Sequence, residues 1–386
     1  MRKIRRHFFI FGFLLLISGM SLGRSGLMPP APEIQAKSWA LYDVSSRHML
    51  VSHQADEKIA PASITKLMTA YLVFSALETK KIKLDQQVAV SETAWKIGGS
   101  RMFIEPNRPV TVEELIKGMI IQSGNDATIA LAELIAETEA NFVKRMNQQA
   151  DRLRLKNTHY VNATGMPDPN HYSSAKDIIT LSMALIRDFP DRYQYYSMKE
   201  YQYNVTQPQY NRNRLLWLNP HVDGIKTGFT QEAGYCLAAS KAIGSRRLIS
   251  VVLGADSEQA RVQESQKLLN YGFLNFDSAL LYQKDSPIAT IPVYKGRLNK
   301  VPIGYGYDFY VTIPKGLSDK MSVKLIRQQP LLAPIYAGQP VGKLQILLQE
   351  KPYVEYPVFA LAAVGSAGWV GNLIDTIRLW FLRHSL

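Results

Sequence analysis

The order of apolar and polar positions predicts strands at both ends of a large region and helices in its middle. Apolar and polar residues alternate over residues 36–53 around a short turn, as in a β-hairpin. From Ser63 to Thr79 the apolar positions follow helical spacing with few polar interruptions, which predicts a helix buried on most sides. Further helices are predicted at residues 111–121, 125–138, 141–153 and 175–189, before strand-like runs return over residues 214–253.

This pattern predicts two domains. Strands, then helices, then strands again indicate one α+β domain over residues 32–283, whose first and last strands meet in a sheet. Shorter β-like runs broken by Pro and Gly follow, and they predict a small all-β domain over residues 284–362.

The last 21 residues, 366–386, have the pattern of an amphipathic helix. One face of the predicted helix carries Trp369, Val370, Leu373, Ile374, Ile377, Trp380 and Phe381. We expect this aromatic-rich face to lie in a membrane interface. The alternative is a C-terminal helix packed on the protein's own core.

The first residues have the pattern of a secretory signal. Four cations precede an apolar run and then small residues, so residues 1–23 are expected to be a signal peptide. A retained membrane anchor is the alternative, but the apolar run is shorter than the roughly 20 residues that a spanning helix needs.

The formal net charge of +13 suits an anionic partner. Charge alone does not distinguish nucleic acid, a phospholipid surface and an acidic polymer. The single cysteine, Cys236, allows no internal disulfide, and its apolar surroundings favour a small buried hydrophobe over a nucleophile. The seven histidines show no metal-binding spacing, so no metal is predicted.

Three short motifs carry candidate chemistry. Ser63 and Lys66 lie three residues apart, on one face of the predicted helix. Alone, this pair reads as a helix cap followed by a surface lysine. Ser123-Gly124-Asn125 and Lys226-Thr227-Gly228 follow in the chain, and the trio in this order resembles penicillin-binding proteins and class A β-lactamases.

The motifs fit attack by a serine on a carbonyl carbon. A serine hydroxyl needs a base to take its proton, and Lys66 can do so only when burial and a second cation such as Lys226 lower its pKa from about 10.4. Ser123 can relay the proton to the leaving amine, and the Asn125 amide can hold Lys66 and the substrate. Backbone N–H groups of Ser63 and Phe229 are expected to stabilise the oxyanion.

Longer stretches extend the resemblance from about residue 34 to the C-terminus. The stretches GSRMFIEPNRPVTVEELIKGMIIQSGNDA, VNATGMPDPNHYSSAKD, NRNRLLW, VDGIKTGFT and QESQKLLNYGF are similar to low-molecular-mass penicillin-binding proteins that act as D-alanyl-D-alanine carboxypeptidases. The resemblance implies an α+β fold with a β-lactamase/transpeptidase-like domain, in which an antiparallel sheet carries a helical subdomain. A small all-β domain and a C-terminal amphipathic helix are implied to follow.

The resemblance also implies an activity. The enzyme would remove the terminal D-alanine from peptidoglycan pentapeptides through an acyl-serine, be acylated by β-lactam antibiotics and need no cofactor. It would be exported to the periplasm and held on the outer face of the inner membrane by its C-terminal helix. Peptidoglycan stem peptides and phospholipid are then the expected partners, and nucleic acid is not.

Site residues follow from the same resemblance. Ser63, Lys66, Ser123 and Asn125 are the expected catalytic residues, and Lys226, Thr227, Gly228, Phe229, Arg261 and Arg212 are the expected substrate-binding residues. Arg261 matches the family's carboxylate-binding arginine, with Arg212 in support. Without the resemblance, Arg261 reads as a solvated arginine on a helix.

One departure and three alternatives remain. Many relatives have histidine where this chain has Phe229, which leaves the turnover rate and the pH optimum open. A β-lactamase of class A needs a glutamate between the second and third motifs, and none occurs between Glu139 and Glu200. Endopeptidase activity on cross-linked peptides uses the same chemistry and stays open. A non-catalytic cell-wall-binding protein is disfavoured by the complete motifs.

Overall fold

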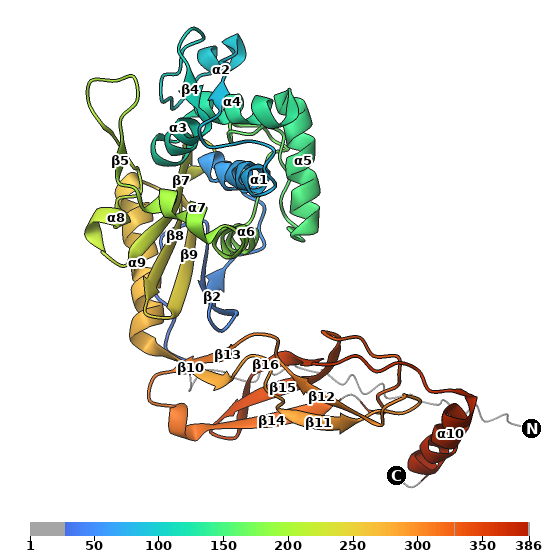
Figure 1. Ribbon diagram of the computed structural model, residues 1–386. Coiled ribbons are helices and arrows are strands. Elements are labelled where there is room, and N and C mark those ends of the chain that lie inside the picture. Colours follow the sequence, from blue (N-terminus) through green and yellow to red (C-terminus); the bar gives the residue numbers. More distant parts are fainter. Residues whose placement is uncertain (1–27, 328, 385–386) are drawn as a thin grey trace, which may run out of the picture.

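A computed structural model describes residues 28–327 and 329–384 of the chain. The predicted signal peptide, residues 1–23, lies outside the described residues. Figure 1 shows a mixed helix and sheet unit above an elongated β unit, with the C-terminal helix α10 at the far end of the β unit. This architecture confirms the predicted α+β fold, the all-β region and the terminal helix.

The upper unit is built on one antiparallel sheet with the strand order β2-β1-β9-β8-β7. Its strands are β1 (Ser38–Asp43), β2 (His48–His53), β7 (Val222–Thr230), β8 (Gly234–Ile243) and β9 (Arg246–Ala255). The β1–β2 pair confirms the predicted hairpin. Pairing of β1 with β9 confirms that the first and last strands share a sheet.

The helices and short strands between β2 and β7 form the second half of this unit. The helical segments are η1 (Ala62–Thr65), α1 (Lys66–Glu78), α2 (Glu92–Lys96), α3 (Val112–Lys117), the π-helix η2 (Gly118–Gln122), α4 (Asn125–Ala136), α5 (Glu139–Arg152), α6 (Ala175–Asp188), α7 (Pro190–Tyr193), η3 (Gln194–Ser197) and α8 (Leu215–Leu218). Short strands pair as β3 (Gln87–Val88) with β4 (Val110–Thr111) and β5 (Glu200–Tyr201) with β6 (Gln209–Tyr210).

Helix α1 is the centre of the main core, as its apolar pattern predicts. Leu67, Met68 and Phe74 are fully buried there. The helix begins at Lys66 and not at Ser63, because residues 62–65 form a 3-10 turn in front of it. Alternating residues of the sheet serve different cores: Val251 of β9 faces the α1 core, while Val252 faces a second core that includes the long helix α9 (Glu258–Asn275).

Helix α9 was not among the helices predicted from the apolar pattern, although Arg261 was read as lying on a helix. Its buried face contains Arg261, Glu264 and Ser265 beside Val262 and Leu268, so polar residues hide the apolar period on which helix prediction depends.

The elongated β unit has its own core. Its elements are β10 (Phe276–Tyr282), β11 (Ala289–Pro292), β12 (Lys300–Gly304), β13 (Phe309–Pro314), η4 (Ser318–Lys320), β14 (Met321–Arg327), β15 (Pro340–Leu348) and β16 (Lys351–Ala360). Five of the strands form a sheet in the order β11-β12-β16-β15-β14, and β10 pairs with β13. Helix α10 (Trp369–His384) follows, and its Asp375 accepts a hydrogen bond from the backbone N–H of Lys295 in this unit.

A buried polar cluster joins the two units. The Asp43 carboxylate, fully buried at the end of β1, pairs with Arg246 at 2.9 Å. It also accepts a hydrogen bond from the hydroxyl of Thr312 on β13 at 2.8 Å. Because a buried carboxylate is costly without partners, this cluster favours one arrangement of the units.

Candidate active site

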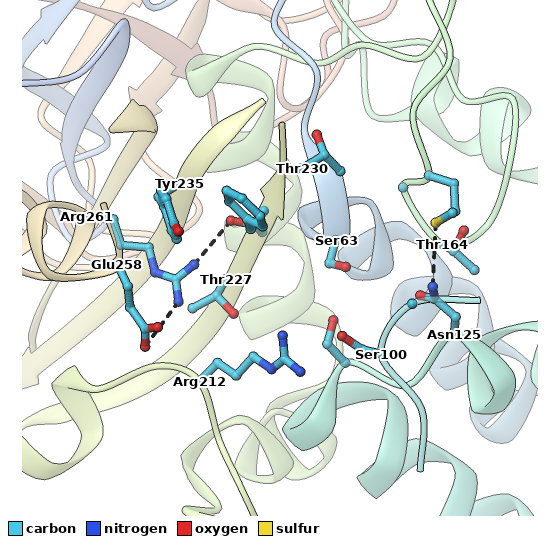
Figure 2. A pocket seen from close by; sticks show the side chains of 16 residues that line it. Ser63, Ser100, Asn125, Thr164, Arg212, Thr227, Thr230, Tyr235, Glu258 and Arg261 are labelled. Atoms are coloured by element: carbon cyan, nitrogen blue, oxygen red, sulfur yellow. Dashed lines mark hydrogen bonds and ion pairs between the residues drawn. The ribbon is translucent and has the colours of Figure 1, made fainter. Parts of the chain in front are cut away.

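A pocket of about 620 Å³ brings the three motifs together. Its lining residues are Ser63, Gly99, Ser100, Ser123, Asn125, Thr164, Gly165, Met166, Arg212, Thr227, Gly228, Phe229, Thr230, Tyr235, Glu258 and Arg261. Figure 2 shows Arg261, Tyr235 and Thr227 on one side and Asn125 on the other, with Ser63 between them. All ten residues expected from the sequence lie in this pocket or directly beneath it.

The turn η1 places Ser63 directly before α1 and against the edge strand β7. Gly228 makes this approach possible. A Cβ atom at this position would lie 2.8 Å from the carbonyl oxygen of Pro61 and 3.2 Å from the backbone nitrogen of Ser63. The third motif therefore needs glycine at its last position because the nucleophile's turn packs onto the strand there.

The amine of Lys66 is buried and surrounded by three oxygen atoms. Its Nζ lies 2.9 Å from the Ser63 hydroxyl, 2.8 Å from Oδ1 of Asn125 and 2.8 Å from the carbonyl oxygen of Thr164. An amide oxygen and a carbonyl oxygen can only accept, so they take two N–H groups of the amine. In neutral Lys66 the remaining lone pair then faces the Ser63 hydroxyl, which is the arrangement that a base needs.

The electrostatics of the pocket favour this neutral form. Burial, with a smaller contribution from the positive charge of Arg212, lowers the pKa of Lys66 from 10.5 to about 7. The sequence suggested Lys226 as the second cation; its amine and that of Lys66 do repel each other, and Arg212 adds a further positive charge that was not expected there. Burial likewise lowers the pKa of Lys226 well below its ordinary value, and there Lys66 and Arg212 both contribute.

Asn125 begins α4 and is fixed from both ends of its amide. While Oδ1 accepts from Lys66, Nδ2 donates to the carbonyl oxygen of Gly98 at 2.7 Å. The next residue, Asp126, accepts hydrogen bonds from the backbone N–H groups of Met102, Phe103 and Ile104. This carboxylate ties the loop that carries Gly99 and Ser100 to the start of α4, and so it holds one wall of the pocket.

Ser123 has an unusual backbone. It follows the π-helix η2 and has a φ of 64°, in the left-handed region that non-glycine residues seldom adopt. The turn directs its hydroxyl to the amine of Lys226, at 2.9 Å. Lys226 also donates to the carbonyl oxygen of Thr227 at 3.1 Å. Ser63–Lys66 and Ser123–Lys226 are thus two hydroxyl–amine pairs in one pocket.

Two arginines line the pocket on the side away from Asn125 (Figure 2). Arg261 is only 3% exposed; its Nη1 donates to the carbonyl oxygen of Gly228, and Glu258 lies 3.6 Å from its Nη2. Its Nε has no hydrogen-bond partner among the described residues. The solvated-helix reading of Arg261 is therefore wrong. Arg212 is exposed, and its guanidinium reaches toward the middle of the pocket.

Residues 162–166 form a loop in one of the stretches that carry the family resemblance. No role in the site was expected for this loop from the sequence. The Asn162 side chain accepts hydrogen bonds from the backbone N–H groups of Thr164, Gly165 and Met166. This turn aims the Thr164 carbonyl at Lys66. The type of side chain does not show which backbone carbonyl contributes to a site. The Asn-x-Thr-Gly pattern does, however, indicate a turn at this place in the sequence.

Cys236 is fully buried, and burial raises the pKa of its thiol to about 11, which confirms the reading as a small buried hydrophobe. In the described part of the chain, no group of three or more His, Cys, Asp or Glu side chains is arranged to hold a metal ion.

Comparisons with known proteins agree with this geometry. Residues 26–257 match the family described as D-alanyl-D-alanine carboxypeptidase. The chain belongs to this family of serine peptidases. Residues 276–366 match a second family, the penicillin-binding protein 5 C-terminal domain, which agrees with the elongated β unit.

Individual relatives cover nearly the whole chain. D-alanyl-D-alanine carboxypeptidase DacC of Escherichia coli (strain K12) is 41% identical over 360 residues, 91% of this chain and 90% of the relative. The crystal structure of penicillin-binding protein 5 from Haemophilus influenzae is 39% identical and superimposes with a TM-score of 0.81, over 88% of this chain and 100% of that one. Penicillin-binding protein D2 of Listeria monocytogenes, in an ampicillin-bound form, is 31% identical with a TM-score of 0.59, over 64% and 100%.

Proposed function

We propose that this D-alanyl-D-alanine carboxypeptidase releases the terminal D-alanine of peptidoglycan pentapeptides through an acyl intermediate on Ser63. The main support is the geometry of the buried Lys66 amine. It donates to Asn125 and to the carbonyl oxygen of Thr164, so in its neutral form its lone pair faces the Ser63 hydroxyl. A serine peptidase needs this relationship between nucleophile and base.

In the first step, Lys66 takes the hydroxyl proton as Ser63 Oγ bonds to the carbonyl carbon of the penultimate D-alanine. The oxyanion is stabilised by the backbone N–H groups of Ser63 and Phe229. The C–N bond to the terminal residue then breaks, and the proton that Lys66 took is relayed through the Ser123 hydroxyl to the leaving amine, which returns Lys66 to its neutral form. The 2.9 Å contact with Lys226 orients the Ser123 hydroxyl for this transfer.

A carboxypeptidase also has to recognise the free carboxylate of its substrate. Arg261, Arg212 and Thr227 line the same side of the pocket and supply the cations and the hydroxyl for this contact.

Water then cleaves the acyl-serine ester and regenerates the Ser63 hydroxyl. In class A β-lactamases a glutamate assists this step, and no glutamate lies between Glu139 and Glu200. Glu139 itself accepts a hydrogen bond from the backbone N–H of Ala163, so it serves to hold the loop before Thr164. Slow release of a β-lactam follows from this arrangement, in agreement with the ampicillin-bound relative.

We further propose that the protein is exported to the periplasm and bound to the outer face of the inner membrane through α10. No helix in the described part of the chain is long and apolar enough to cross a bilayer. The large apolar residues of α10 are exposed: Trp369 81%, Leu373 56%, Ile377 51%, Trp380 56% and Phe381 58%. An exposed aromatic face on an amphipathic helix suits interfacial binding.

Labelling with a fluorescent penicillin tests the nucleophile. The wild-type protein is expected to form a covalent adduct that maps to the peptide containing Ser63, and Ser63→Ala is expected to form none. Ser75→Ala, on the same helix but outside the pocket, is the matched control and should label normally. Retained labelling in Ser63→Ala would contradict the assignment.

A further inference from the structure

Phe229 forms an apolar surface at the edge of the pocket. It lies directly opposite Tyr235 in the register between β7 and β8, and the two ring centroids are 4.3 Å apart with 32° between the planes. Tyr235 covers one side of the Phe229 ring, while Phe229 remains 43% exposed and lines the pocket. Contact with the tilted Tyr235 ring holds the Phe229 ring in one orientation, so its free surface is a fixed part of the site.

This ring pair is continuous with the proposed carboxylate site. The Arg261 guanidinium carbon lies 5.5 Å from the centre of the Tyr235 ring, a cation–π contact. Arg261 also donates to the carbonyl oxygen of Gly228, the residue before Phe229. Figure 2 shows Tyr235 beside Arg261 and Glu258.

The chemistry of an amino acid connects this surface with the leaving residue. The α-carboxylate and the side chain are bonded to the same Cα atom, about 1.5 Å from the carboxylate carbon. A carboxylate held by Arg261 and Thr227 therefore brings the side chain of that residue within a few ångströms of the surfaces around Arg261. Phe229 and Tyr235 supply the apolar part of those surfaces.

Polar groups near the rings are partly engaged. The Thr230 hydroxyl accepts a hydrogen bond from the backbone N–H of Ala233, and Glu258 lies 3.6 Å from Arg261. A polar side chain that lies on the two rings would lose water over their apolar surface, which costs binding energy. An apolar side chain gains contact instead.

We propose that Phe229 and Tyr235 form an apolar platform that contacts the side chain of the leaving D-residue and selects an apolar residue there. This inference rests on the proposed function and assigns a role to the Phe229 side chain, in addition to its backbone N–H. It favours D-alanine as the leaving residue over a residue with a long polar side chain, as in a cross-linked peptide.

The test uses a pair of peptides that end in D-Ala-D-norvaline and D-Ala-D-asparagine, whose last side chains are similar in reach and differ in polarity. Both are supplied to the full-length protein in one reaction, so the ratio of the two kcat/KM values is measured directly. We expect the wild type to prefer the norvaline peptide by about tenfold. Phe229→Ala is expected to bring the ratio close to one.

Two further variants separate the platform from general damage to the site. Tyr235→Phe keeps both rings and should keep the wild-type ratio. Phe229→His keeps a flat ring but adds polar nitrogens, so the ratio should fall between those of the wild type and Phe229→Ala. Because a ratio is measured, a variant that is merely less stable loses rate on both peptides without changing it.

The outcomes distinguish this inference from the proposed function. An unchanged ratio in both Phe229→Ala and Phe229→His, or a wild type without preference, overturns the platform while peptide release still supports the carboxypeptidase. Failure of the wild type to release the terminal residue from a peptide that ends in D-Ala-D-Ala contradicts the proposed function and the inference with it.

Discussion

The amine nitrogen of Lys66 lies 2.9 Å from the hydroxyl oxygen of Ser63, while Asn125 and Thr164 hold its other side at 2.8 Å each. Burial and Arg212 keep the pKa of this amine at about 7. A lysine in ordinary water would be almost entirely protonated at neutral pH, but here about half of the molecules carry a neutral amine at pH 7.

This relationship predicts how acylation depends on pH. Only neutral Lys66 can accept the Ser63 proton, so the acylation rate should rise through pH 7 and level off above it. At one to two pH units below the midpoint, each unit should cost about tenfold. Stopped-flow measurement with a chromogenic β-lactam from pH 5 to 9 tests this; a rate that is flat or falls with pH would contradict it.

Arg212→Gln should move that midpoint upward. The Arg212 cation lowers the pKa of Lys66, and without it the amine stays protonated to higher pH. Acylation at pH 6.5 should therefore slow, while the plateau rate at high pH changes less. Arg214→Gln removes an exposed arginine outside the pocket lining and should leave the midpoint in place. An equal effect of both variants would rule out a specific action of Arg212 on Lys66.

His171 should make stability depend on pH. Its ring is 3% exposed, with Nε2 at 2.8 Å from the Thr65 hydroxyl and Nδ1 accepting the backbone N–H of Val161. Burial lowers its pKa from 6.5 to about 4, so the unfolded chain binds a proton that the folded state excludes. The titration of His171 therefore leaves the free energy of unfolding unaffected above pH 6.5 and lowers it as the pH drops from 6.5 toward 4. At about 1.4 kcal/mol per pH unit, the total loss is on the order of 3 kcal/mol.

Urea unfolding at pH 7.5 and 5.0 measures this effect. His171→Gln should be less stable than the wild type at pH 7.5, because it disturbs the contacts with Thr65 and Val161, but it should lose less stability on going to pH 5.0. His221→Gln, at an exposed position, is the control and should follow the wild type. A pH dependence identical in His171→Gln and the wild type would contradict the assignment to His171.

Deleting the residues from Ser366 onward should abolish binding to anionic vesicles and leave penicillin acylation intact. Replacing Trp369 and Trp380 together by Ser should weaken vesicle binding strongly, since both rings lie on the exposed apolar face. Asn372→Ala changes a position of α10 outside that face and should bind like the wild type. Sedimentation of the truncated protein with vesicles would contradict the anchor.

Sequence periodicity identified much of the fold for an identifiable reason. Helices α5 and α6 each bury one face, so their apolar residues repeat with the helical period. Helices α1 and α4 are buried on most sides and were recognised as long apolar runs with few polar interruptions. Helix α9 was not recognised from its apolar pattern because Arg261 and Glu264 occupy its buried face.

The site was predicted to the extent that side chains define it. The three motifs meet in one pocket as expected, yet the Thr164 carbonyl, which holds Lys66, could not be assigned from residue identity. The sequence suggested Lys226 as a cation near Lys66 but not the contribution of Arg212, because distances among three cations depend on packing that the sequence does not display. Burial of Arg261 depends in the same way on the contact between α9 and β8.

Mass spectrometry of a purified pentapeptide muropeptide, incubated with the protein with and without penicillin, tests the central claim most directly. The account predicts loss of one D-alanine in the untreated sample, no loss after penicillin, and no loss with Ser63→Ala. Loss of D-alanine that persists in Ser63→Ala, or an intact pentapeptide after incubation with active wild-type protein, would contradict it.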